Sequence, residues 1–152
     1  MTNPVGAGTV DEAMTQIVYT VSPDSTLKES LRILAEHEIG AVVVAEEDRV
    51  LGILTERDIV KALARRPDTM ETPVGRVMSR PVATVSPKTR LAQALRIMVQ
   101  RKVRRLPVTT RGKLRGIITA RDIMRWMLTR VSPKYRAQPL ALEELARIYE
   151  WK

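Results

Sequence analysis

The sequence repeats itself once, and this repeat is the strongest constraint on its fold. A shift of 64 positions aligns residues 10–63 with residues 74–127 without a gap, and 18 of the 54 aligned positions are identical. The identical positions include Val21-Ser22-Pro23 with Val85-Ser86-Pro87, and Gly52-Ile53 with Gly116-Ile117. A twofold repeat predicts two similar units about a pseudo-twofold axis, each burying the apolar face that the other cannot bury alone.

Both copies predict the same order of elements, β-α-β-β-α. In the first copy, a helical turn at 10–14 precedes a strand at 17–21. A helix follows, with one apolar face formed by Leu27, Leu31, Leu34 and Ala35, and by Leu91, Leu95, Met98 and Val99 in the second copy. The apolar run 41–45 predicts a strand buried on both faces, and a strand at 50–54 and a helix from Thr55 to about Arg66 complete the unit. We therefore expect an α+β protein.

The repeat also predicts the domain borders. The first repeat spans 10–66, a polar linker bounded by prolines spans 67–73, and the second repeat spans 74–130. Residues 1–9 read as a flexible tail. The extension 131–152 contains a predicted C-terminal helix after Pro139, with Leu142, Leu145 and Tyr149 on one side.

Charge is divided unevenly between the repeats. The chain carries a net charge of +9, but residues 10–66 have 7 basic and 11 acidic side chains, whereas residues 74–130 have 15 basic and 1 acidic. A strongly basic half is typical of proteins with anionic partners, although an arginine-rich solvated surface would give the same pattern. The split also favours a homodimer in which the acidic repeat of one chain faces the basic repeat of another, an antiparallel arrangement.

Composition excludes several classes of function. With no Cys and one His (His37), the chain has no thiol nucleophile, no cysteine zinc site and no cluster of histidines for a metal. We therefore expect no enzyme and no metal site. Because the sequence contains no apolar run of membrane-spanning length and no signal peptide pattern, we expect a cytoplasmic protein without a membrane partner.

One short motif occurs in both repeats. It reads Gly52-Ile-Leu-Thr55-Glu-Arg-Asp58-Ile in the first and Gly116-Ile-Ile-Thr119-Ala-Arg-Asp122-Ile in the second. Threonine before a helix with an acid three residues later is close to a capping box, so helix capping is the simple interpretation. Asp122 is, however, the one acid kept in the basic repeat, and a carboxylate there can accept hydrogen bonds from a ribose diol while phosphate is drawn to a helix N-terminus.

These motifs, together with Val-Arg-Arg-Leu-Pro-Val at 103–108, resemble a tandem pair of cystathionine-β-synthase (CBS) domains, the Bateman module, over residues 10–130. The resemblance implies a regulatory module without catalytic activity or cofactor that binds AMP, ADP or ATP in clefts between its repeats. S-adenosylmethionine is another ligand of the family. An unidentified effector protein would receive the output.

The resemblance also implies site residues. One nucleotide site would combine Thr55 and Asp58 with Met78, Ala83, Val103 and Arg104. The other would combine Thr119 and Asp122 with Met14, Tyr19, Ile39 and Gly40. Arg104 and Arg105 resemble the family's phosphate contacts, and the aligned residues of the first repeat are uncharged, so we expect the Asp58 site to bind phosphate better.

Two alternative functions are also compatible with the sequence. The basic repeat allows a polyanion-binding or nucleic-acid-binding protein, but aromatic residues make up only 3% of the chain and no Phe is present, so a base-stacking platform is not expected. A module that serves only protein interaction, such as dimerisation, fits the charge split equally well. His37, on a predicted helix between two glutamates, is expected to be exposed and without a role.

Overall fold

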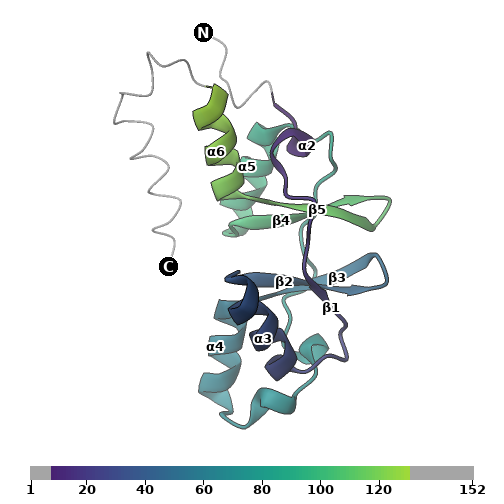
Figure 1. The fold of residues 1–152 in the computed structure, drawn as a ribbon, viewed down its shortest axis with the longest axis vertical. Coiled ribbons are helices and arrows are strands. Elements are labelled where there is room, and N and C mark those ends of the chain that lie inside the picture. Colours follow the sequence, from purple (N-terminus) through teal and green to yellow (C-terminus); the bar gives the residue numbers. More distant parts are fainter. Residues whose placement is uncertain (1–7, 131–152) are drawn as a thin grey trace. The chain divides into compact units, whose positions relative to one another are not determined.

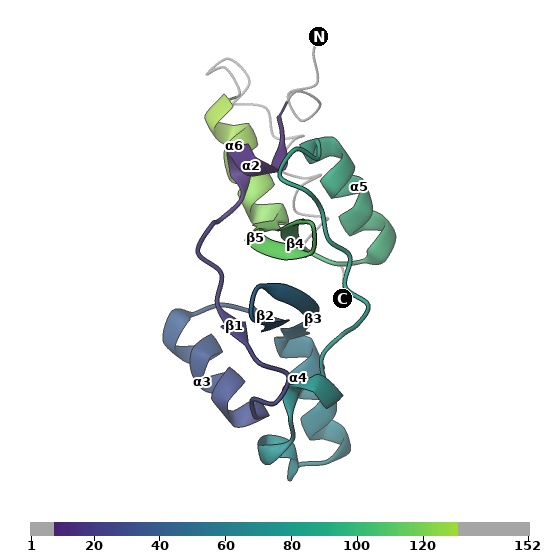
Figure 2. The same ribbon diagram turned by 90° about the vertical axis from the view of Figure 1, so that its right-hand side faces the viewer.

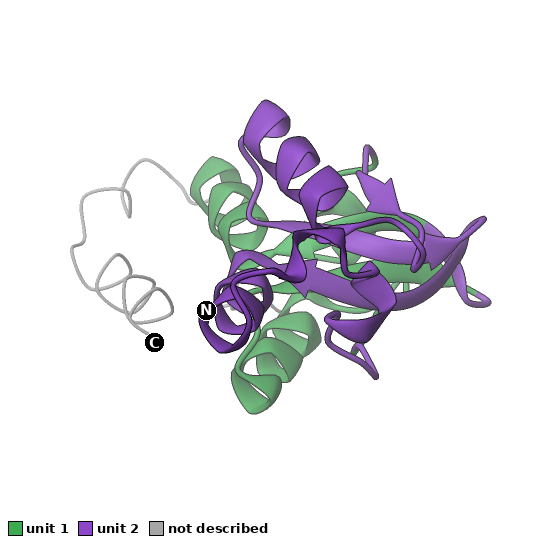
Figure 3. Cartoon of the chain, turned by 90° about the horizontal axis from the view of Figure 1, so that it is seen from below, with its two compact units in different colours: residues 1–16, 83–110, 115–152 green, residues 17–82, 111–114 purple. Residues whose placement is uncertain are grey.

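The computed structural model describes residues 8–130, so the expected helix after Pro139 and most of the N-terminal tail lie outside the described residues. The chain divides into two compact units, coloured separately in Figure 3. Among the described residues, unit 1 comprises 8–16, 83–110 and 115–130, and unit 2 comprises 17–82 and 111–114. Five strands with helices between them, within residues 8–130, confirm the α+β class.

The units do not coincide with the sequence repeats, because each repeat gives its first residues to the other unit. Residues 10–16 of the first repeat belong to unit 1, and residues 74–82 of the second repeat belong to unit 2. We call these two stretches the exchanged segments. In unit 1, Thr15 and Ile117 exchange two backbone hydrogen bonds of 2.9 Å, and in unit 2 the Val74 N–H donates to the Ser25 carbonyl at 2.7 Å.

Unit 2 contains a small sheet with both helices on one face (Figures 1 and 2). Its elements are β1 (Thr20–Val21), α3 (Leu27–His37), β2 (Ala41–Glu46), β3 (Arg49–Thr55), α4 (Glu56–Arg65), and the 3-10 turns η1 (Thr69–Glu71) and η2 (Val74–Arg76). Strand β1 pairs in parallel with β2, and β2 pairs antiparallel with β3. The core includes Leu27, Leu34, Val42, Leu54, Ile59 and Val74.

Unit 1 has the corresponding elements of the second repeat. They are α2 (Val10–Ala13), α5 (Leu91–Arg101), β4 (Arg105–Thr110), β5 (Lys113–Thr119) and α6 (Ala120–Arg130). The turn between β4 and β5 is grouped with unit 2, where the Leu114 N–H donates to the Asp48 carbonyl at 2.8 Å. The unit 1 core includes Val10, Leu91, Met98, Leu106, Ile118 and Trp126.

The helices lie where their apolar spacing predicts, but one edge of the predicted apolar face is wrong. Helix α3 buries Leu27, Ser30 and Leu34, while Ala35 is exposed. In α5 the aligned Val99 is 52% exposed. The buried residues follow the spacing i, i+3, i+7, which places the residue after Leu34 or Met98 beyond the edge of the core-facing stripe.

The predicted strand at 17–21 is shorter than expected. Only Thr20 and Val21 form β1, and Ile17 is 76% exposed. The chain leaves unit 1 at Gln16 and enters unit 2 at Ile17, so the β-branched residues at 17 and 18 have no strand to pair with despite their propensity. The prediction for β2 is confirmed, since Val42, Val43 and Val44 are all buried although neighbouring side chains point to opposite faces.

Candidate functional site

The first candidate corner lies in unit 2, where β3 ends at Thr55 and α4 begins. The Thr55 hydroxyl accepts from the Asp58 N–H at 3.2 Å, and Asp58 Oδ2 accepts from the Thr55 N–H at 2.9 Å. The capping interpretation of Thr-x-x-Asp is therefore confirmed here. Both side chains are half-buried, so the carboxylate keeps some access to solvent while its backbone bonds hold it in place.

The exchanged segment 74–82 completes this corner. The Ser79 hydroxyl donates to Asp58 Oδ1 at 3.0 Å, and Ser79 exchanges two backbone hydrogen bonds with Ile53 of β3. Gly52 permits this close approach, because a Cβ on it would lie 2.8 Å from the Ser79 carbonyl oxygen and 2.7 Å from the Met78 sulfur. The Met78 sulfur therefore lies close to Gly52, three residues before Thr55.

The second corner, in unit 1, repeats this design with different neighbours. The Asp122 N–H donates to the Thr119 hydroxyl at 3.0 Å, and Asp122 Oδ2 accepts from the Thr119 N–H at 2.9 Å. A Cβ on Gly116 would lie 2.7 Å from the Thr15 carbonyl oxygen and 3.0 Å from the Met14 sulfur. In place of a serine, the exposed Arg125 approaches Asp122 Oδ1 at 3.9 Å.

The remaining candidate residues are divided between the units. Ala83, Val103, Arg104 and Arg105 belong to unit 1, whereas Tyr19, Ile39 and Gly40 belong to unit 2. Within each unit, the residue before the hairpin contacts the start of the following helix. The Gly40 carbonyl accepts from the Glu56 N–H at 3.0 Å, and the Arg104 carbonyl accepts from the Ala120 N–H at 2.9 Å.

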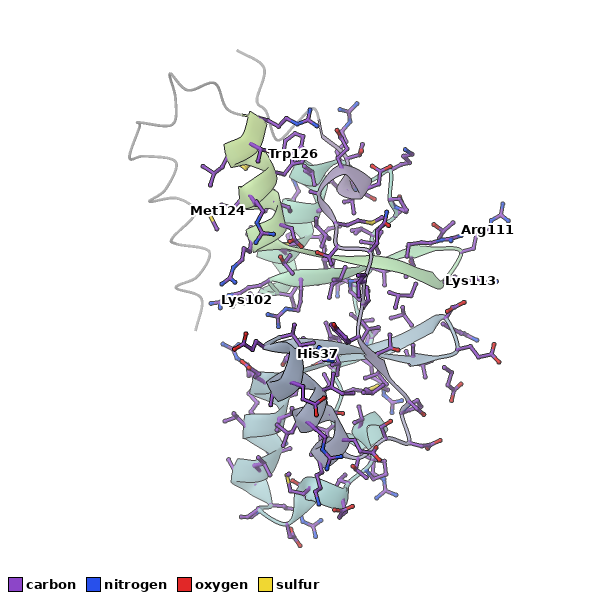
Figure 4. All side chains as sticks on the ribbon, viewed as in Figure 1. His37, Lys102, Arg111, Lys113, Met124 and Trp126 are labelled. Atoms are coloured by element: carbon purple, nitrogen blue, oxygen red, sulfur yellow. The ribbon has the colours of Figure 1, made fainter. Side chains whose placement is uncertain are left out.

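Two features of the site were missed by sequence reasoning. Ser79 is one of them, although a signal was present, because the aligned residue Thr15 also carries a hydroxyl. The other is a stack between Tyr19 and His37, whose ring centroids lie 3.8 Å apart at an interplanar angle of 19°. His37 is exposed, as predicted, at the end of α3 (Figure 4). The aligned residues Ala83 and Arg101 cannot form such a stack, so it belongs to the first repeat alone.

The corners are suited to binding a polar ligand. Each offers a fixed carboxylate beside the N-terminal end of a helix, and such an end attracts anions while a carboxylate accepts from hydroxyl groups. Among residues 8–130, no group of three or more His, Cys, Asp or Glu side chains is placed to hold a metal ion. Within the same range, no helix is both long enough and apolar enough to cross a membrane.

Two similar units, each with a capped carboxylate corner completed by an exchanged segment, define a tandem-repeat module. Comparison with known families identifies the repeat, since the CBS domain model matches residues 10–65 and again residues 74–129. The chain belongs to the CBS domain family.

Similar proteins support this membership. A CBS domain-containing protein of Bacillus subtilis, YhcV, is 35% identical over 114 residues, covering 75% of this chain and 81% of that protein. The crystal structure of a CBS-domain containing protein from Agrobacterium tumefaciens matches with a TM-score of 0.73 at 34% identity, covering 78% of this chain and 98% of the other. The structure of CBSX2 in complex with AMP matches with a TM-score of 0.71 at 27% identity, covering 80% and 96% of the two chains.

Proposed function

We propose that this CBS pair is a regulatory module that binds an adenine nucleotide, AMP, ADP or ATP, and catalyses no reaction itself. The observation that carries the proposal is the corner of Thr55, Asp58 and Ser79, with its counterpart at Thr119 and Asp122. A capping box needs no second chain segment beside it, yet an exchanged segment reaches each corner. The AMP complex of the similar protein CBSX2 supports this class of ligand.

The proposed chemistry divides the nucleotide between two kinds of group. The carboxylates of Asp58 and Asp122 accept hydrogen bonds from the ribose diol, because an ionised carboxylate is an acceptor with several lone pairs. Arg104 and Arg105 bind the phosphate groups, because a guanidinium offers paired donors that match phosphate oxygens. The adenine contacts come from Met78, Ala83 and Val103 at the first site, and from Met14, Tyr19, Ile39 and Gly40 at the second.

The two sites are proposed to differ in strength. The first repeat has Gly40 and Ala41 where the second has Arg104 and Arg105, so one site lacks two cationic side chains. We assign those arginines to the nucleotide on Asp58. At the other corner, the Arg125 guanidinium lies 3.9 Å from Asp122 Oδ1 and competes for the carboxylate that a ribose would use.

The absence of catalysis is proposed on the residues that form the corners. Asp58 and Asp122 are each held in their own capping box, so they do not form an acid–base pair, and a chain with one His and no Cys lacks the usual nucleophile and base. The output would pass to a separate effector protein in the cytoplasm. We also propose an antiparallel homodimer, because the charges of the two repeats are complementary.

Calorimetry and thermal shift with AMP, ADP and ATP test the proposal. At about 100 times the dissociation constant, a ligand stabilises the fold by about 2.7 kcal/mol, which raises the melting temperature by roughly 5–11 °C. The sharpest variant is Asp58→Asn, which keeps a capping oxygen but loses the charge. We expect it to weaken nucleotide binding roughly 10- to 100-fold, the factor that corresponds to a lost hydrogen bond to a charged acceptor.

The matched control is Asp122→Asn, which makes the same change at the other corner. We expect it to weaken binding less. If Asp122→Asn is the more damaging variant, the assignment of the arginines is wrong. If protein freed of co-purified ligand shows no response to any adenine nucleotide, the corners are helix caps and the nucleotide proposal fails.

A polyanion-binding function is the second candidate, favoured by the exposed basic turn between β4 and β5. Arg111 and Lys113 project from this turn (Figure 4) and, like Gly112 between them, are exposed. Nucleic-acid binding through 6–10 phosphate contacts would weaken by about 10³- to 10⁵-fold between 50 and 200 mM salt. The polyanion-binding function would be favoured if DNA or RNA bound with a sub-micromolar dissociation constant in 150 mM salt while nucleotide at millimolar concentration did not bind. The nucleotide-binding function would be favoured if nucleotide binding were unchanged by both Arg111→Ala and Lys113→Ala.

A further inference from the structure

One face of α5 forms an open depression that the nucleotide proposal does not use. The depression has a volume of about 340 Å³ and is lined by Arg90, Ala92, Gln93, Arg96, Ile97 and Gln100. The opposite side of the helix buries Leu91, Ala94 and Met98 in the unit 1 core. Because the lining residues within 8–130 come from α5 and its N-cap, the depression is described as part of unit 1.

The repeat provides an internal reference for this face, because α3 is the aligned helix of unit 2. On α3 the corresponding positions carry Lys28, Glu29 and Glu36, an ordinary hydrated surface. On α5 they have become Ala92, Gln93 and Gln100, while the exposed Ala35 has become Val99, which is 52% exposed. The face has therefore lost three charges, two of them negative, and gained Arg90 in place of Thr26. Its charges, Arg90 and Arg96, are both positive, which favours a partner that carries negative charge.

The one charge that α5 keeps in common with α3 on this face is positive. Arg96 aligns with Arg32, but Arg96 is exposed and makes no ion pair with residues 8–130. The acids of unit 1 within that range are Asp11, Glu12 and Asp122, and they pair with Lys88, Arg130 and Arg125. A partner for Arg96 must therefore bring its own negative charge.

We propose that the face of α5 is the docking surface for this chain's own residues 139–152. That stretch carries Leu142, Leu145 and Tyr149 at helical spacing, and its three acids, Glu143, Glu144 and Glu150, outnumber its two basic residues, Arg147 and Lys152. As a helix, its leucines cover Ile97, and its glutamates pair with Arg96. The proposal is independent of the nucleotide function.

The length of the intervening chain permits this docking. Helix α6 ends at Arg130 and contacts α5 within unit 1. The nine residues from Arg130 to Pro139 can span up to about 30 Å. Fourteen helical residues extend about 21 Å, slightly more than the length of about 17 Å expected for the eleven residues of α5. The segment therefore reaches the face and covers it in one piece.

The cysteine-free sequence allows a direct test in the full-length protein. Lys152→Cys, labelled with a nitroxide, leaves every acidic and apolar residue of the segment in place. In amide NMR spectra we expect the label to broaden the signals of α5 and to leave those of α3, the matched control helix, unchanged. Arg96→Glu should weaken docking roughly fivefold, the factor that about 1 kcal/mol for an exposed ion pair gives, while Arg32→Glu should not.

A mixed sample decides between docking within the chain and docking on a second copy. Labelled chains without ¹⁵N are combined with unlabelled ¹⁵N chains, so that any broadening arises between molecules. Broadening of α5 in this sample, comparable to that in the singly labelled protein, would overturn the proposal in favour of a second copy. The proposal is also overturned if α5 and α3 are broadened equally, or if neither is broadened.

Discussion

Replacing Gly52 by alanine tests the contact between β3 and the exchanged segment 74–82. The new Cβ would lie 2.7 Å from the Met78 sulfur and 2.8 Å from the Ser79 carbonyl oxygen. The methionine side chain can move away at little cost. The carbonyl oxygen cannot move without loss, because it accepts from the Ile53 N–H at 3.2 Å, and the Ser79 N–H in turn donates to the Ile53 carbonyl at 2.8 Å.

We expect Gly52→Ala to lower the free energy of unfolding by about 1–3 kcal/mol, the usual cost of adding a group to a packed site. For a chain of this length, that corresponds to a fall in melting temperature of roughly 2–12 °C. Urea unfolding measures the loss, and hydrogen exchange locates it. The Ser79 amide should lose protection first, because the methyl group on β3 pushes the Ser79 segment away from its acceptor, the Ile53 carbonyl.

The control is Gly112→Ala, in the turn between β4 and β5. Gly112 has a φ of +80° and nothing lies within 4 Å of its added Cβ, so its cost of about 1–2 kcal/mol comes from the left-handed backbone alone. This variant should leave the exchange of the Ser79 amide unchanged. If Gly52→Ala matches the original protein in both unfolding and Ser79 exchange, the segment does not approach β3 as closely as the structure indicates.

Three further predictions concern unit 1 and the assembly. The hydrogen bond from Lys88 lowers the pKa of Asp11 below its ordinary value of 3.8, so their ion pair adds stability above that pH. This stability is lost as the pH falls through the lowered pKa. The original protein should therefore melt at a higher temperature than Lys88→Met at pH 7, and this difference should disappear in strong acid. Trp126→Ala should cost about 3–5 kcal/mol in urea unfolding, because Trp126 is only 9% exposed and its ring packs close to Gly8; a cost below 1 kcal/mol would contradict that packing. The charge split predicts an antiparallel homodimer, to be tested by sedimentation and by cross-linking between opposite repeats at low salt; a monomer at micromolar concentration, or a parallel pair, would contradict it.

The sequence predicts the elements of this fold well because the two copies support each other. The spacing of Leu27 and Leu34 predicts a helix, and the aligned Leu91 and Met98 predict the same helix in the second copy. The Thr-x-x-Asp caps at both corners follow from local hydrogen bonding. The prediction of a strand at 17–21 is wrong for residues 17–19, because a local signal does not determine strand pairing. Propensity at Ile17 reports what the residue favours, but pairing depends on which strand lies beside it.

The exchange of segments was not predictable from the repeat. Alignment by 64 positions shows that residues 10–16 and 74–82 are alike, and two like segments fit either unit. The Ser79–Asp58 hydrogen bond depends on that choice, since the two residues are 21 positions apart and meet only because the second repeat's segment packs against the first repeat's strand. The hydroxyl shared by Ser79 and Thr15 marks the position, but it does not tell which unit each segment joins.

The exchange also sets an order for folding during synthesis. Residues 17–82 leave the ribosome before the remainder of unit 1, so all of unit 2 except the turn at 111–114 can form early. Val10, which is fully buried in the finished protein, is made before α5 and α6 and has no core to enter until they follow. The segment 10–16 is thus the last to gain its partners, and a nascent chain stalled near the linker would leave Val10 exposed to any chaperone within reach.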